Sequence, residues 1–351
     1  MTSQLALLGC AHIHTPGFIK TALARTDVKI KSVWDHDAPR GQQRADELQA
    51  RFFPDLRTIL DDSEIAGVIV CSETNRHEEI VSATFRAGKK FIFVEKPLGM
   101  GARDAYAMAD AIDKVGAKFQ TGYFVRGGPM VNFIREQINK GTFGKITRIR
   151  GSNCHSGALG GWFDNKPNDH AADWRWMADP KIAGVGAFGD LGTHLLDIMI
   201  WMMGDVTEVA CTLDNGTARY EGCDETGEAL MRFSNGTIGT LAAGWDDVAN
   251  PVFLLVSGTE GHAAIIDQKL YLQCKNIEGA DGKTPFTKLP EQIPAGLDSF
   301  LDAVVGKPAV LVTAQEAAYR SAVMEAMYDA AKQQKWVAVA SPQKAQDSRR
   351  T

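Results

Sequence analysis

The sequence lacks several features that would mark a membrane or secreted protein. No apolar run approaches the ~20 residues that a membrane-spanning helix requires. Residues 1–4 carry no Lys or Arg ahead of the short apolar stretch at 5–8, so we expect no secretory or lipoprotein signal. The six cysteines are scattered without a C-x-x-C pair, which argues against a disulfide framework and a thiolate metal site. We therefore expect a cytoplasmic protein without membrane contact.

Basic residues are fewer than acidic residues and are dispersed along the chain. The chain has 38 Lys and Arg against 43 Asp and Glu, a formal net charge of -5, and no segment concentrates the basic residues. A nucleic-acid partner is not expected, because binding the phosphate backbone requires a basic surface. With 351 residues, 44% of them hydrophobic and 23% charged, the chain has the composition of a globular protein large enough for two domains.

The first third of the chain alternates short apolar runs with helical patterns. The runs are LALL (5–8), IKSVW (30–34), GVIVC (67–71), FIFV (91–94) and KFQTGY (118–123). Strands that are apolar throughout and separated by helices indicate a parallel sheet covered on both faces. We therefore predict an α/β fold, a doubly wound domain over residues 1–124.

The pattern changes beyond residue 124. Strand-like runs between 145 and about 275 are broken by DNGT (214–217) and SNGT (234–237), and Asn-Gly favours type I′ hairpin turns. Helices are predicted at 129–140, 190–203 and 313–333. We expect a second, α+β domain over residues 125–340, with an open, mostly antiparallel sheet and flanking helices. A polar tail at 341–351 follows, which we expect to be disordered.

The loop after the first predicted strand suggests a dinucleotide site. LALLG leads into a helix that Thr15 would cap and Pro16 would open. In the Rossmann fingerprint G-x-G-x-x-G, Gly9 matches the first glycine, whereas Ala11 and His14 replace the other two. Asp35 ends the second strand, where an acidic residue accepts hydrogen bonds from the ribose hydroxyls of NAD.

Two points about the cofactor stay open. Arg40 lies near Asp35 in sequence and leaves use of NADP open beside NAD. His12 and His14 are either partly exposed loop residues or contacts to the phosphate or nicotinamide of the cofactor. No metal site is expected, because no carboxylate lies near them in sequence.

Two further motifs carry candidate chemistry. FIFVEKPLG (91–99) delivers Glu95 and Lys96 to the carboxyl edge of the sheet, where open α/β sheets bind ligands, although an isolated lysine there could equally be solvated. In 184–204, Asp190, His194 and Asp197 share one helix face. A histidine beside carboxylates suits a general base, a buried structural pair or a metal site.

Together these motifs resemble the Gfo/Idh/MocA family of glucose-fructose oxidoreductase, inositol dehydrogenase and rhizopine catabolism proteins. The likeness extends over nearly the whole chain. It includes Gly9, SETNRH (72–77), VEKPLG (94–99), GYFVRGGPMV (122–131), GTFGKITRIRG (141–151), DWRW (173–176), GDLGTHLLD (189–197) and LDSFLDAV (297–304).

The resemblance implies roles for individual residues. Catalysis would involve Lys96, Asp190 and His194, with Asp197 in support. The residues implied in cofactor binding are Gly9, Ala11, His12, His14, Asp35, Ser72, Thr74, His77, Glu95 and Lys96. Those implied in substrate binding are Lys96, Arg126, Trp162, Trp174, Arg175, Asp190 and His194. The resemblance also implies a cis Lys96-Pro97 bond and a homodimer or homotetramer formed through the C-terminal sheet.

The substrate class follows from residues 154–176. Three tryptophans stand there among polar side chains, a combination that suits the apolar faces and hydroxyl edges of a carbohydrate ring. The alternative is that this segment packs at a domain junction or a subunit interface. The sequence departs from the family pattern in the glycine loop and in the spacing of Ser72, Thr74 and His77.

We therefore predict an NAD(P)-dependent dehydrogenase that transfers a hydride between nicotinamide and a secondary hydroxyl of a sugar, glycoside or cyclitol. One alternative is an NAD-dependent glycosidase that oxidises C3 transiently and eliminates the aglycone. Another is a non-catalytic sensor of sugars or dinucleotides, although a sensor has no chemical need of Lys96, Asp190 and His194 together.

Overall fold

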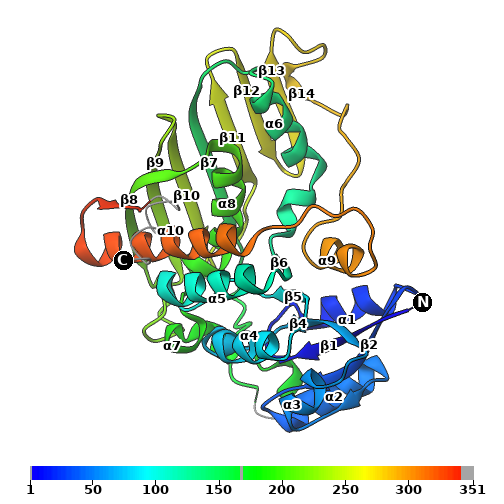
Figure 1. Ribbon diagram of the computed structural model, residues 1–351. Helices are drawn as coiled ribbons and strands as arrows, with labels where there is room; N and C mark the ends of the chain where they lie inside the picture. Colours follow the sequence, from blue (N-terminus) through cyan, green and yellow to red (C-terminus); the bar gives the residue numbers. More distant parts are fainter. Residues whose placement is uncertain (1, 167–168, 341–351) are drawn as a thin grey trace. The chain divides into compact units, whose positions relative to one another are not determined.

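The computed structural model describes residues 2–166 and 169–340, so the predicted polar tail at 341–351 lies outside the described residues. The chain divides into two compact units (Figure 1). The first unit consists of residues 1–124, 162–185 and 294–321, and the second of 125–161, 186–293 and 322–351. No helix among the described residues is long and apolar enough to cross a membrane.

The first unit is built on a six-stranded parallel sheet in the order β3-β2-β1-β4-β5-β6. Its strands are β1 (Ser3–Leu8), β2 (Val28–Trp34), β3 (Arg51–Phe52), β4 (Ile65–Val70), β5 (Phe91–Val94) and β6 (Lys118–Thr121). The order reverses between β1 and β4, which is the arrangement of a doubly wound fold. All five predicted strands are present, and the short β3 was not predicted.

The helices of this unit are α1 (Thr15–Leu23), α2 (Ala38–Leu48), α3 (Leu56–Leu60), α4 (His77–Arg86), α5 (Ala102–Val115), α7 (Pro180–Ala183) and α9 (Leu297–Val304). Helix α9 packs with α1 and α2 in one apolar cluster on the sheet, to which it contributes Leu297, Phe300 and Leu301. Helices α4 and α5 lie side by side (Figure 1). The boundary between the units falls within α10 (Ala314–Gln333).

Segments 162–185 and 294–321 therefore group with the first unit, although the sequence analysis assigned them to a continuous second domain at 125–340. The physical reason is side-chain packing over long sequence separations. The apolar face of α9 is buried against the sheet, and Trp176 donates a hydrogen bond to the carbonyl of Ala11. Neither contact leaves a local pattern in the sequence.

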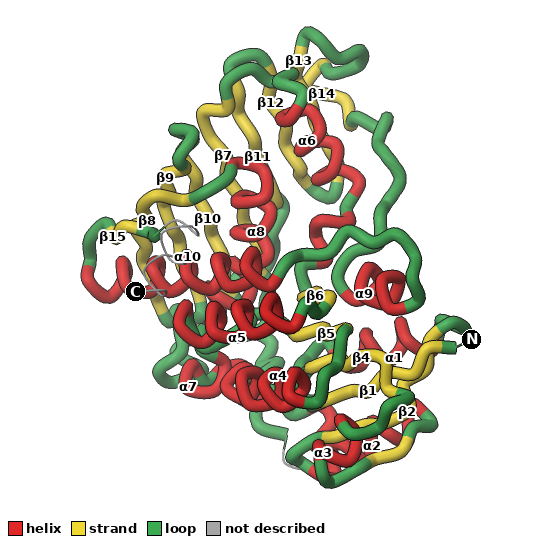
Figure 2. The backbone as a smooth tube through the Cα atoms, viewed as in Figure 1, coloured by secondary structure: helices red, strands yellow, loops and turns green. Residues whose placement is uncertain are grey.

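The second unit is built on a nine-stranded sheet in the order β14-β13-β12-β11-β7-β10-β9-β8-β15. Its strands are β7 (Ile146–Cys154), β8 (Val206–Asp214), β9 (Thr226–Phe233), β10 (Ile238–Gly244), β11 (Val252–Gly258), β12 (Gly261–Ile266), β13 (Lys269–Cys274), β14 (Asp281–Pro285) and β15 (Val337–Ala338). Every pairing is antiparallel except that of β7 with β10. Helices α6 (Pro129–Asn139) and α8 (Ala187–Met203) accompany the sheet, and α8 packs on its central strands (Figure 2).

The two predicted Asn-Gly hairpins differ in outcome. SNGT does connect β9 to β10, but only Gly236 of the Asn-Gly pair has a positive φ, at +87°, so the turn is not type I′. The side chain of Asn235 accepts a hydrogen bond from the amide of Thr237. DNGT does not form a tight hairpin, because the connection from β8 to β9 spans residues 215–225. There the carboxylate of Glu225 accepts hydrogen bonds from the amides of Thr217, Arg219 and Tyr220, which holds the longer loop in place.

Candidate functional site

The loop between β1 and α1 follows the predicted strand, loop and helix order. Gly9 has φ +77°, and a Cβ built on it would lie 2.5 Å from the Cβ of Ser72. The amide of His12 donates to the carbonyl of Cys71 at 3.0 Å. The loop therefore lies directly against the carboxyl end of β4. The prediction that Thr15 caps α1 is wrong, because His14 occupies the N-cap position without a side-chain capping bond.

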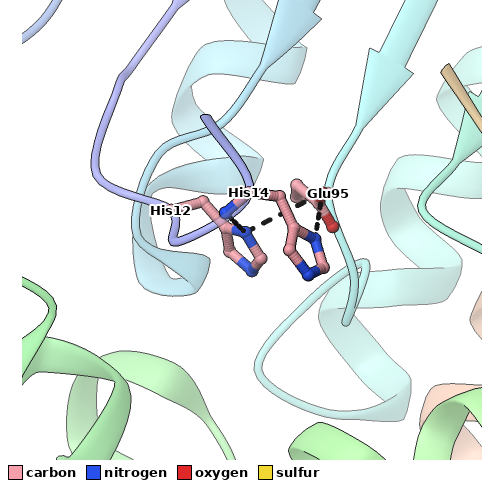
Figure 3. Close-up of side chains that lie close together, drawn as sticks. All are labelled: His12, His14 and Glu95. Carbon is pink, nitrogen blue, oxygen red and sulfur yellow. Dashed lines mark hydrogen bonds and ion pairs between the residues drawn. The ribbon is translucent and has the colours of Figure 1, made fainter. Parts of the chain in front are cut away.

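His12, His14 and Glu95 form a cluster in this loop region (Figure 3). His14 Nδ1 lies 3.0 Å from Glu95 Oε1, and His12 Nδ1 lies 3.8 Å from the same oxygen. His12 is buried, whereas the side chain of His14 is 32% exposed. Burial would raise the pKa of the Glu95 carboxyl, but His12, His14 and Lys96 hold it well below its usual range. The carboxylate is therefore ionised although no part of it reaches solvent.

Asp35 lies at the predicted end of β2, and its carboxylate is fully engaged. Oδ2 accepts hydrogen bonds from the amide of Cys10 and from Arg40 Nε, and Oδ1 accepts from the amide of Asp37 and from Arg40 Nη2. Arg40 also pairs with Glu73 at 3.0 Å. Asp35 thus ties the glycine loop to α2, and a ribose hydroxyl would compete for its lone pairs.

In the predicted cofactor-side segment at 72–77, Ser72, Thr74 and His77 are buried. The two ring nitrogens of His77 lie 3.1 Å from the carbonyl oxygen of Leu98 and 3.3 Å from that of Ser72. Burial lowers the pKa of His77, so the ring is neutral and donates to one of these carbonyls. His77 therefore links the segment after β4 to the loop after β5.

The loop after β5 contains Lys96, whose side chain is buried rather than solvated. Its backbone amide donates to Glu95 Oε2 at 2.8 Å. The Lys96-Pro97 peptide bond is cis, as the resemblance implied. Burial at the carboxyl edge of a parallel sheet removes the surface-lysine interpretation.

The aromatic segment at 162–185 belongs to the first unit. Trp162 is 42% exposed, and Trp174 lies beneath the ammonium of Lys166 at 4.9 Å. Trp176, which we did not predict as a site residue, donates from Nε1 to the carbonyl of Ala11 at 3.0 Å. The sequence gives no sign that Trp176 makes this hydrogen bond, because its partner Ala11 lies 165 residues away.

In the second unit, α8 carries Asp190, His194 and Asp197, and all three are buried. Asp190 Oδ2 accepts a hydrogen bond from Trp245 Nε1 at 3.3 Å. Asp197 forms a two-point ion pair with Arg126, with distances of 2.8 and 2.6 Å. Trp245 was not predicted, whereas Arg126 was predicted to contact substrate and is held here by the carboxylate of Asp197.

The N-terminus of α8 is held by two residues that the sequence analysis missed. Asp224 accepts from the amide of Phe188 through Oδ2 and from the hydroxyl of Tyr328 through Oδ1. The Tyr328 oxygen in turn accepts from the amides of Gly186 and Gly189. Asp224 lies 36 positions from Phe188 and Tyr328 lies 139 positions from Gly189, so no local capping pattern could reveal them.

Replacing Tyr328 with phenylalanine is expected to lower the free energy of unfolding by about 1–3 kcal/mol, because buried donors and an acceptor lose their partner. Urea denaturation measures the loss. Tyr271 on β13 is half-buried like Tyr328, so Tyr271→Phe is the matched control and should change stability by less than about 0.5 kcal/mol. Equal effects of the two substitutions would contradict this account of the helix terminus.

The predicted site residues therefore divide between the units. The first unit contains Lys96 and the predicted cofactor residues, together with Trp162, Trp174 and Arg175. The second contains Asp190, His194 and Arg126.

Similarity to known proteins is found along most of the chain. Residues 4–123 match the model of an oxidoreductase family with an NAD-binding Rossmann fold, and residues 131–264 match the model of the GFO/IDH/MocA C-terminal domain. The first unit therefore contains an NAD-binding domain, as the loop at Gly9 predicted.

Two relatives illustrate the range of the similarity. A levoglucosan dehydrogenase of Pseudarthrobacter phenanthrenivorans is 29% identical over 59% of this chain and 57% of its own length. A myo-inositol 2-dehydrogenase of Thermotoga maritima is 25% identical over 68% of this chain and 65% of its own length. Both matches span less than two thirds of the relative.

A solved structure of levoglucosan dehydrogenase in complex with NADH and levoglucosan has the same fold. It superposes with a TM-score of 0.80 at 20% identity, covering 97% of this chain and all of the other. The two matched domain models, in the expected order along one chain, agree with this fold. The chain belongs to the Gfo/Idh/MocA family of NAD-binding oxidoreductases.

Proposed function

We propose that the protein transfers a hydride between NAD(H) and a secondary hydroxyl of a sugar, glycoside or cyclitol. The observation that carries the proposal is the pair Asp190 and His194, buried on α8 of a chain whose other unit is an NAD-binding domain. A buried carboxylate and imidazole one helical turn apart can exchange a proton with a bound hydroxyl.

The residues have separate roles in this proposal. His194 takes the proton of the substrate hydroxyl, and Lys96 stabilises the developing negative charge on its oxygen. Asp190, fixed by Trp245, orients the imidazole and the substrate. The nicotinamide of bound NAD supplies the hydride acceptor.

The first unit fits a dinucleotide at the loop after β1. Gly9 lets the loop pack directly on Ser72, where a Cβ would clash, and α1 begins at the end of this loop, where backbone amides favour phosphate. We propose that Ala11, His12 and His14 line the phosphate side, with Ser72, Thr74, Glu95 and Lys96 nearer the nicotinamide ribose. Asp35 would bind the adenosine ribose only by sharing lone pairs now used by Cys10 and Arg40.

The carbohydrate proposal draws support from Trp174. Its indole Nε1 is buried and has no hydrogen-bond acceptor among the described residues. A buried donor without an acceptor is costly, and a substrate hydroxyl would satisfy it. We propose that Trp174, Trp162 and Arg175 contact the sugar. Arg126 is instead proposed to hold α8 through its ion pair with Asp197 and not to contact the substrate.

The experiment is to denature the purified protein, assay released NAD(H), and then mix intact protein and NAD with cyclitols, aldoses and glycosides while following absorbance at 340 nm. NADH formed with one substrate class supports the dehydrogenase. Retained cofactor, no net NADH and product from a glycoside would favour the glycosidase. Sugar binding without any single-turnover absorbance change would favour a sensor.

We also propose that the protein forms a homodimer or homotetramer through the second-unit sheet. Apolar side chains are exposed on adjacent strands there, with Leu230 on β9 44% exposed and Ile238 on β10 46% exposed. Light scattering coupled to gel filtration should give two or four times the chain mass, and Leu230→Lys should shift it toward one. A monomer at micromolar concentration would reject the proposal.

A further inference from the structure

The cluster of His12, His14 and Glu95 has the dimensions of a metal site. One ligating atom from each residue can be chosen so that all lie within 4.8 Å of one another. Glu95 Oε1 lies 3.0 Å from His14 Nδ1 and 3.8 Å from His12 Nδ1. Tetrahedral zinc with bonds of 2.0–2.1 Å places neighbouring ligand atoms about 3.3 Å apart, so separations of up to 4.8 Å would have to shorten by at most about 1.5 Å when the metal binds.

The donor set also fits this chemistry. Two imidazoles and one carboxylate are the protein ligands of a common class of zinc site, in which a fourth position stays open to water or substrate. The sequence argued against a metal because no carboxylate stands near the two histidines. The fold removes that objection by placing Glu95 of the loop after β5 beside them (Figure 3).

The three side chains are held by a rigid surrounding. The peptide bond that precedes His12 is held at both of its polar atoms, because the His12 amide donates to the carbonyl of Cys71 and the Ala11 carbonyl accepts from Trp176 Nε1. Glu95 is buried, and its Oε2 accepts from the Lys96 amide, which leaves Oε1 directed at the histidines. Prearranged ligands reduce the ordering that metal binding would otherwise require.

One competing contact is present. The backbone amide of His14 donates to His12 Nδ1 at 3.2 Å. A metal bound through Nδ1 would replace this bond, whereas a metal bound through Nε2 would leave it in place. In the absence of a metal, the histidines lie beside the buried carboxylate of Glu95.

We propose that His12, His14 and Glu95 bind one divalent transition-metal ion of the zinc class, with a fourth coordination position open. None of the three residues is among those proposed for proton transfer, although all three are proposed to line the cofactor site, and metal binding by them does not depend on hydride transfer being the activity. It would place a Lewis acid in the loop where the family binds the dinucleotide phosphates.

The test uses the full chain without a histidine tag, treated with chelator and dialysed. Titration with Co²⁺ should produce the intense visible absorption of a tetrahedral N/O site with a stoichiometry of one per chain, and Zn²⁺ should displace it. His14→Ala should weaken Co²⁺ binding by at least about 100-fold, beyond the effect of removing an outer-shell partner. His170→Ala, a half-exposed histidine paired with Asp37 in the same unit, is the control and should bind Co²⁺ unchanged.

The partial exposure of His14 makes its substitution the decisive variant if Glu95→Gln or His12→Ala fails to fold, as judged by circular dichroism. Loss of the Co²⁺ spectrum in folded His14→Ala supports the site. The proposal is overturned if the unsubstituted protein binds no stoichiometric Co²⁺ or Zn²⁺. It is also overturned if folded His14→Ala binds Co²⁺ as tightly as the His170→Ala control.

Discussion

Replacing His194 with alanine is expected to lower kcat by roughly 10²- to 10⁴-fold, the usual contribution of a general acid-base group. The side chain is buried on α8, beside the turn that carries Asp190. Without the imidazole, the substrate hydroxyl has no proton acceptor as alkoxide character develops. The affinity for NADH should stay within about twofold, because His194 belongs to the second unit and the NAD-binding domain to the first.

The measurement is steady-state kinetics with the substrate identified by the 340 nm assay, together with fluorescence titration of NADH. His262→Ala removes a half-buried histidine on β12 whose partner is Ser257 and serves as the control. Turnover of the His194 variant within about threefold of the unsubstituted protein would contradict its role as general base. A parallel loss in both variants would point instead to damage to the second unit.

Replacing Gly9 with alanine is expected to lower the free energy of unfolding by about 2–5 kcal/mol and to weaken NADH binding at least tenfold. The left-handed backbone costs an L-residue roughly 1–2 kcal/mol, and overpacking typically costs about 1–3 kcal/mol more. Both apply, because φ is +77° and the new Cβ would lie 2.5 Å from the Ser72 Cβ. Two of the three nearest atoms are the backbone nitrogen and Cα of the buried Ser72, which no side-chain rotation can move. The loop at Gly9 must therefore shift to make room for the methyl group.

Gly17→Ala is the matched control, since Gly17 lies in α1 with no positive φ, and beyond its chain neighbours and its own helix backbone no atom lies within 4 Å of the new methyl group. It should leave stability unchanged or raise it by up to about 1 kcal/mol, the difference in helix propensity between the two residues. Urea denaturation and NADH titration of both variants decide the matter. A Gly9 variant as stable as the Gly17 variant would contradict the prediction, because it would show that the loop accommodates a methyl group at position 9.

Local pattern was sufficient for five of the six strands in the first unit's sheet. Its strands are apolar throughout because helices cover the sheet, and this pattern is visible in runs such as GVIVC and FIFV. The positions of α6, α8 and α10 were also predictable, since each follows a helical spacing of apolar residues. The Asn-Gly dipeptide was a weaker predictor of a tight hairpin, because at DNGT the backbone amides bind Glu225 in a longer loop between β8 and β9.

In the candidate site too, the motif residues were predictable from the sequence and the residues that hold them in place were not. Gly9, Lys96, Asp190 and His194 stand in motifs whose residue types and spacing by themselves indicate chemistry, and the family they indicated is confirmed. Their supports were not predictable. Trp245 beside Asp190, and Asp224 with Tyr328 at the start of α8, come from other elements of the second unit.

Motif residues could be identified from the chain alone because local backbone geometry, such as a strand ending in a glycine loop, restricts which residue types are tolerated. Partnerships across the fold needed the tertiary structure. Glu95 meets His12 and His14 only because β1 and β5 run parallel in one sheet, and Arg126 is bound to Asp197 only because α8 packs near it. His14 and Glu95 are 81 residues apart and Arg126 and Asp197 are 71 apart, separations at which sequence spacing does not show that buried charges are paired.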